Sequence, residues 1–213
     1  MRNFNWSYNS TKKNAFSASF DPEKWVDILK IAHLSVLEGL SKTSEIVLRD
    51  ADIFEDGSLS SLLLNKAIIA DFKSRVRASH MWNKRVRFFK SNRMIYCLVD
   101  REFFICFKAL GKEGIIEGMD TMRFADTMNG VDFSLNQEVH QELSKLAIKG
   151  IPPVLFVGFK KDRQSISEVR FHHYCDNEIA LDIVLAQGAL SSGSKFKSKN
   201  NKASDSDDES VAV

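Results

Sequence analysis

The sequence has few cysteines and no long hydrophobic run. No stretch of about 18 apolar residues, the length that a bilayer-spanning helix needs, occurs in the 213-residue chain. The first residues, Met1 to Trp6, lack the apolar core of a secretion signal. The three cysteines, Cys97, Cys106 and Cys175, show no CxxC spacing, which argues against a disulfide framework and against a zinc ribbon. These absences predict a cytoplasmic protein that makes no contact with a membrane.

The motifs of the common enzyme classes are also absent. The sequence contains no P-loop, no dinucleotide-binding glycine pattern, no HExxH metallopeptidase motif and no GxSxG hydrolase motif. Possible metal ligands occur together in the run 172–175, but on a strand His173 and Cys175 would face one side and His172 the other. We therefore expect no metal site and no cofactor. Whether the chain is an enzyme stays open, and the sequence names no catalytic residue.

Positive charge is concentrated in one part of the chain. The net charge is only +2, yet residues 73–101 contain nine basic residues and one acid, Asp100. The rest of the chain is therefore acidic overall. Three explanations stay open: a solvated surface of the fold, a surface that binds nucleic-acid phosphates, and a surface that binds an acidic protein. The candidate binding residues are Arg75, Arg77, Lys84, Arg85, Arg87, Lys90 and Arg93.

Hydrophobic spacing predicts an α+β fold. Helical spacing occurs in two N-terminal segments, the first from Asp21 to about Gly39 and the second from Leu59 to Ala78. A short amphipathic helix is expected over residues 135–148. Apolar alternation with period two predicts strands over residues 84–90, 93–99, 102–108, 154–160, 166–174 and 178–185. The expected architecture is two N-terminal helices packed on an antiparallel sheet of about six strands, with one inserted helix.

Composition divides the chain into three parts. Residues 1–20 are polar with scattered aromatics and are expected to form an N-terminal arm, or a short strand over 15–20. Residues 21–187 are expected to form a single α+β domain, in which 41–58 is an irregular connection. Residues 188–213 are rich in Ser, Lys, Asn and Asp, and they offer too little apolar surface to offset the entropy of ordering. The sequence therefore predicts a disordered C-terminal tail.

The order of several segments resembles a family of small bacterial proteins. A helix that ends in Arg75-Val76-Arg77 leads into a basic strand, and two apolar strands follow. After a loop and a helix come one more apolar strand and a charged turn before the next strand. The strand segments concerned are Lys84–Phe89, Ile95–Asp100, Phe104–Leu110, Leu155–Phe159 and Ile166–Arg170. This order, over about residues 60–185, resembles the toxin side of the RosmerTA toxin–antitoxin pair, whose partner regulator carries an Xre helix-turn-helix and an ImmA/IrrE-type metallopeptidase domain.

The resemblance implies a neutralising partner of the Xre/ImmA type and a role in growth arrest or anti-phage defence. It supplies no catalytic residues. The leading hypothesis is therefore a toxin-like component that acts through its basic residues on an anionic target and is held in check by the regulator. A non-catalytic nucleic-acid-binding accessory protein is the first alternative. The second is a divergent metal-dependent nuclease with Asp100 or Glu102 as a metal ligand.

Overall fold

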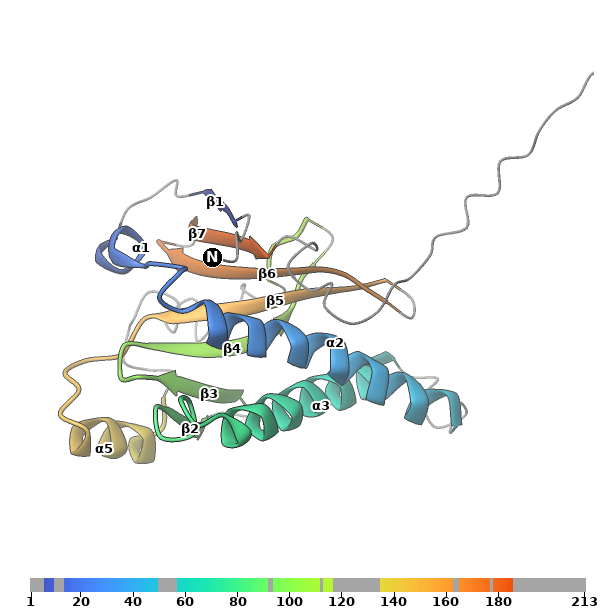
Figure 1. Cartoon of the computed structure of the whole chain (residues 1–213), viewed down its shortest axis with the longest axis horizontal. Coiled ribbons are helices and arrows are strands. Elements are labelled where there is room, and N and C mark those ends of the chain that lie inside the picture. Colours follow the sequence, from blue (N-terminus) through green and yellow to red (C-terminus); the bar gives the residue numbers. More distant parts are fainter. Residues whose placement is uncertain are drawn as a thin grey trace, which may run out of the picture.

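Seven strands form one mixed sheet, and helices pack on both of its faces (Figure 1). The computed structural model describes residues 6–9, 14–49, 57–91, 94–111, 113–116, 135–162, 165–176 and 178–185. The elements are β1 (Trp6–Asn9), α1 (Ala15–Ser19), α2 (Val26–Arg49), α3 (Gly57–Ala78), β2 (Val86–Ser91), β3 (Met94–Val99), β4 (Phe103–Ala109), α5 (Gln137–Lys145), β5 (Val154–Asp162), β6 (Ser165–Cys175) and β7 (Glu178–Leu185). The α+β architecture predicted from the sequence is confirmed.

The strand order across the sheet is β1-β7-β6-β5-β4-β3-β2, so β1 and β2 lie at opposite edges. Antiparallel pairing joins β2 to β3, β3 to β4, β5 to β6 and β6 to β7. The first edge strand, β1, comes from the segment predicted as an arm and pairs antiparallel with β7. The segment 15–20, for which a strand was one expectation, instead contains helix α1, capped by the Asn14 side chain.

The pair β4 and β5 is parallel, which differs from the antiparallel sheet expected from the sequence. Cys106 lies beside Phe156, and Ala109 lies beside Phe159. A parallel pair needs a crossover connection, because the chain must return to the starting end of the sheet. The connection between β4 and β5 contains α5 and supplies that crossover.

Helices α2 and α3 pack together and cover one face of the sheet. The core below them contains Ile28, Val36, Ile68 and Phe72 from the helices and a row of inward-facing strand residues. Gly39, where the sequence suggested a helix end, lies inside α2. A Cβ atom there would lie 2.5 Å from Cγ1 of Ile68, so the glycine allows the two helices to approach closely. The prediction that 41–58 is irregular is wrong for residues 41–49 and 57–58, which are helical.

Helix α5 covers part of the other face. Its N-terminus is capped by Asn136, whose Oδ1 accepts a hydrogen bond from the Val139 amide at 3.1 Å. Val139 and Leu143 are buried against Leu98 and other residues of a second hydrophobic cluster. The two clusters use alternate residues of the same strands, which is why both faces of the central strands are apolar.

The structure bears on two further expectations. No helix in the described part of the chain is long and apolar enough to span a membrane. The tail predicted over residues 188–213 lies outside the described residues, which end at Leu185.

Candidate functional site

Three of the predicted binding residues surround one hollow at the beginning of β2. The hollow has a volume of about 360 Å³. Its lining residues are Lys84, Arg85, Arg87, Leu98, Asp100 and Arg101. Strand register explains part of this arrangement, since Arg87 pairs with Leu98 across β2 and β3 and the two residues of a cross-strand pair present their side chains on the same face. The backbone also holds the rim together, because the Asp100 amide donates a hydrogen bond of 2.7 Å to the Arg85 carbonyl.

Arg85 is held in place by two neighbours. Its Nη2 lies 2.5 Å from Oδ2 of Asp100, and its Cζ lies 4.6 Å from the centre of the Trp82 ring. The hydrogen bond from Arg85 lowers the pKa of Asp100, and partial burial of the carboxyl opposes that shift. The carboxylate is therefore ionised at neutral pH, and it offsets one of the positive charges around the hollow.

The other three cations leave the hollow with a surplus of positive charge. Lys84, Arg87 and Arg101 are exposed, and none of them forms an ion pair within the described ranges. Arg101 lies on the β3–β4 turn with a positive φ of 63°, directly after Asp100 at 50°. Arg101 belongs to the basic run of residues 73–101 but was not among the predicted site residues. Arg101 directly follows Asp100, the acid that pairs with Arg85, and this position in the sequence is the signal that points to Arg101.

The remaining predicted residues lie elsewhere. Arg75 pairs with Asp71 on α3 at 2.5 Å, and Asp71 also accepts a hydrogen bond from Lys42 of α2 at 2.9 Å. Burial of Asp71 would raise its pKa, but the hydrogen bonds from Arg75 and Lys42 outweigh that effect and lower it. The Lys42–Asp71 bond therefore links α2 to α3, whereas the Arg75–Asp71 pair lies within α3. The role of Arg75 in the structure is to neutralise a buried carboxylate.

Two further predicted cations lie away from the hollow. Arg77 is exposed near the end of α3, and Lys90 is exposed at the far end of β2. The Lys90 carbonyl accepts a hydrogen bond of 3.4 Å from Asn136, beside α5. Arg93 lies outside the described residues. Of the described candidate residues, only Lys84, Arg85 and Arg87 therefore line one hollow.

The carboxylates considered as metal ligands are each paired with a cation. Asp100 pairs with Arg85, and Glu102 pairs with Lys24 at 2.8 Å. A search of the described residues found no group of three His, Cys, Asp or Glu side chains that could hold a metal ion. Nothing in this arrangement favours the nuclease alternative.

The histidine run has structural contacts on both faces of β6. On one face His173 bonds with the Val154 carbonyl through Nδ1 at 2.9 Å and with the Asn14 amide through Nε2 at 2.7 Å. On the other face His172 lies with Nε2 at 3.1 Å from Oδ1 of Asp182. The two histidines therefore face opposite ways, as strand alternation predicts, and each has partners inside the fold.

Comparisons with known proteins add no family to these observations. No family model, no curated protein and no solved structure matches the chain.

Proposed function

We propose that the protein binds nucleic-acid phosphates at the hollow formed by Lys84, Arg85, Arg87 and Arg101. In this proposal it serves as the toxin-like component of a bacterial toxin–antitoxin or anti-phage defence module. The observation that carries the binding proposal is the excess of cations over acids around a single concave site. The biological setting comes from the resemblance in segment order, which also suggests an Xre/ImmA-type regulator as the neutralising partner.

The chemistry of the hollow suits a phosphodiester backbone. Arginine presents a planar fork of N–H donors that matches phosphate oxygens, and lysine supplies a compact point charge. Arg85 is already oriented by Trp82 and Asp100, so less side-chain entropy is lost when an anion binds. If three cations contact phosphates, log K should fall against log salt with a slope of roughly −2 to −3.

Binding is tested by fluorescence anisotropy with labelled single-stranded RNA, single-stranded DNA and duplex DNA at several salt concentrations. Arg87→Glu and Lys84→Glu should each weaken binding at least about tenfold, because each replaces an attractive charge with a repulsive one. Lys66→Glu is the matched control, since Lys66 is an exposed cation on α3 and does not line the hollow. Equal loss of binding in the control, or no loss in Arg87→Glu, would contradict the proposed site.

The toxin role is tested by growth. Induced expression of the wild-type chain should arrest growth, and Arg87→Glu at the same level, measured by immunoblot, should not. Co-expression of the regulator encoded beside the gene should restore growth. Normal growth at high expression would reject the toxin role. The anisotropy measurement would then test the alternative of a non-catalytic nucleic-acid-binding accessory protein, because that alternative uses the same hollow.

A further inference from the structure

A strongly acidic segment follows the last described strand in the sequence. It comprises residues 205–209 and holds four acids around one serine, Asp205, Ser206, Asp207, Asp208 and Glu209. The basic hollow has the opposite character, because four cations line it together with Leu98 and the single acid Asp100. The acidic segment and the hollow are therefore complementary in charge, although they lie far apart in the sequence.

The chain between β7 and the acidic segment is long enough to reach the hollow. Five strand spacings, or about 24 Å, separate β7 from β2 across the sheet. Since β4 and β5 are parallel and β5, β6 and β7 alternate in direction, β7 begins at the end of the sheet where the hollow lies and ends about 27 Å away. The twenty residues from Leu185 to Asp205 can span up to about 66 Å, which exceeds the resulting separation of about 36 Å.

The hollow already accepts one carboxylate. Nη2 of Arg85 donates a hydrogen bond of 2.5 Å to Oδ2 of Asp100. The other three cations, Lys84, Arg87 and Arg101, are exposed and form no ion pair within the described part of the chain. A carboxylate matches the planar fork of an arginine, so an incoming aspartate or glutamate can pair with Arg87 or Arg101 as Asp100 pairs with Arg85.

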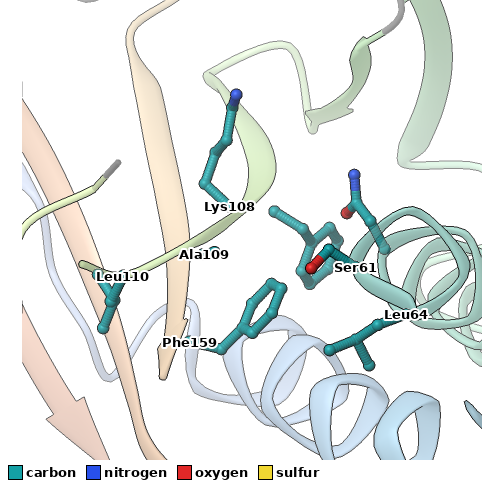
Figure 2. Close-up of a pocket in the computed structure, with 8 residues that line it drawn as sticks. Ser61, Leu64, Lys108, Ala109, Leu110 and Phe159 are labelled. Atoms are coloured by element: carbon teal, nitrogen blue, oxygen red, sulfur yellow. The ribbon is translucent and has the colours of Figure 1, made fainter. Parts of the chain in front are cut away.

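A second hollow, between α3 and the ends of β4 and β5, does not suit the acidic segment (Figure 2). Its volume is about 250 Å³, and Leu64, Phe107 and Phe159 in its lining are buried. Lys108 is the one cation of that lining, and Figure 2 shows its ammonium group pointing away from Leu110 and Phe159. A carboxylate seated on these walls would lose its hydration without gaining a cation.

The lysines that precede the acidic segment in the sequence are competing partners. They are Lys195, Lys197, Lys199 and Lys202. Ion pairs between exposed side chains contribute little when each pair stands alone. The cations of the hollow instead surround one concave site, which focuses their field on a single group. The hollow is therefore the stronger partner for the acidic segment.

We propose that the acidic segment Asp205–Glu209 docks in the basic hollow of the same chain and competes there with nucleic acid. The competition rests on the nucleic-acid function proposed above, whereas the docking does not. Because the segment is tethered, its effective concentration at the hollow is on the order of millimolar, so weak pairing is enough to occupy the site. A nucleic acid that presents many phosphates displaces the segment, and weakly binding anions are excluded.

Docking is tested without nucleic acid, by paramagnetic relaxation in the full chain. A nitroxide label on Ser210→Cys, in a Cys175→Ser background, should broaden the amide signals of Lys84 and Arg101 at the hollow. The amide signal of Ser61, which lines the second hollow, should stay sharp. Absence of broadening at the basic hollow, or equal broadening at both hollows, overturns the proposal.

Two substitutions in the labelled chain test which cations hold the segment. Arg87→Glu should sharpen the signal of Arg101, because a repelling charge then lines the hollow. Lys66→Glu should leave that signal broadened, since Lys66 is an exposed cation that does not line the hollow. Broadening that persists in Arg87→Glu, or that disappears equally in Lys66→Glu, would reject the hollow as the docking site.

Competition is measured by anisotropy with single-stranded RNA at about 0.05 M salt. A variant with a neutralised acidic segment should bind at least about threefold more tightly than the wild type, because a hollow that is occupied two thirds of the time shows one third of its affinity. The substitutions are Asp205→Asn, Asp207→Asn, Asp208→Asn and Glu209→Gln. A control with the same change in net charge should bind as the wild type does; it replaces four exposed acids outside the hollow, by Asp27→Asn, Glu45→Gln, Glu113→Gln and Glu178→Gln.

The outcomes separate docking, competition and the proposed function. Equal tightening in the neutralised variant and its control would reflect net charge alone and would overturn the competition. Unchanged affinity in the neutralised variant would overturn it as well, even where the label reports docking. If no variant binds RNA, the proposed nucleic-acid function fails, and the relaxation measurement still decides whether the acidic segment docks.

Discussion

Asp100 is the acid that lines the basic hollow, and it pairs with Arg85 at 2.5 Å between Oδ2 and Nη2. The pair has two opposing effects. It fixes the Arg85 guanidinium group against Trp82, and it offsets part of the positive charge that an anionic ligand would meet. Because Arg85 lowers the pKa of Asp100, the stability from this pair is present above the ordinary pKa of aspartate. It is lost as the pH falls through the lowered value.

Asp100→Asn should therefore tighten nucleic-acid binding and slightly destabilise the fold. Removal of one repelling charge, worth about 1 kcal/mol near contact distance in water, corresponds to roughly fivefold higher affinity. Loss of a half-exposed ion pair should lower the free energy of unfolding by less than about 1 kcal/mol. Anisotropy at two salt concentrations and urea unfolding measure these effects. Weaker binding would show that Asp100 acts mainly by orienting Arg85.

Gly39→Ala should destabilise the protein although alanine is the better helix former. The new methyl group would lie 2.5 Å from Cγ1 of Ile68 and 2.8 Å from its backbone nitrogen, so α3 itself would have to move. Overpacking of this kind costs about 1–3 kcal/mol, which exceeds the gain of about 1 kcal/mol in helix propensity. Urea unfolding measures the difference.

Ser41→Ala is the matched control for Gly39→Ala. Ser41 is exposed two residues further along the same helix, so alanine there changes helix propensity without a new contact. Its free energy of unfolding should be equal to that of the wild type or slightly higher. Stabilisation by both substitutions would show that α2 and α3 do not approach closely at Gly39.

Local pattern was enough to predict most elements of the fold. The strand runs and the inserted helix were found because side chains of a strand alternate between faces, and because an amphipathic helix repeats about every 3.6 residues. The prediction that the first helix ends near Gly39 was wrong because of tertiary packing. A glycine that ends a helix and a glycine that lets a second helix approach closely cannot be told apart in a sequence. The parallel pairing of β4 with β5 depends on the route of the connection between them, which apolar alternation does not encode.

The candidate site was only partly predictable for a similar reason. A run of basic residues shows how much positive charge a segment carries, but it does not show which carboxylate neutralises each residue. Arg75 is four residues from Asp71 on one helix, and that pairing was visible in the sequence. The pairing of Arg85 with Asp100 arises from the β2–β3 register, which the run of basic residues does not encode.

The three cysteines should differ sharply in reactivity. Burial raises the pKa of Cys97 and of Cys106, and both thiols are fully buried, so neither forms the reactive thiolate. Cys175 is only partly buried. Titration of the folded wild-type protein with Ellman's reagent should therefore detect one thiol. The same titration of the folded Cys175→Ser variant should detect none. In denaturant the wild type should show all three. Rapid reaction of more than one thiol in the folded state would contradict the burial of Cys97 and Cys106.

His33 should make the protein less stable in mild acid. It is buried on α2 with Nδ1 unpartnered, and burial lowers its pKa from 6.5 to about 4. The unfolded chain therefore binds a proton between these values while the folded chain does not, so the free energy of unfolding falls as the pH decreases from 6.5 to 4. The full shift corresponds to about 3 kcal/mol.

The variant His33→Leu isolates this effect, because leucine is neutral at every pH and leaves no buried nitrogen without a partner. The difference in unfolding free energy between variant and wild type should grow in favour of the variant as the pH falls from 6.5 to 4. Burial also lowers the pKa of His173, but that residue is common to both proteins and cancels in the difference. His80→Gln is the control, since His80 is exposed, and its stability should follow that of the wild type across this range. A pH-independent difference for His33→Leu would mean that His33 takes up its proton equally in the folded and unfolded chains.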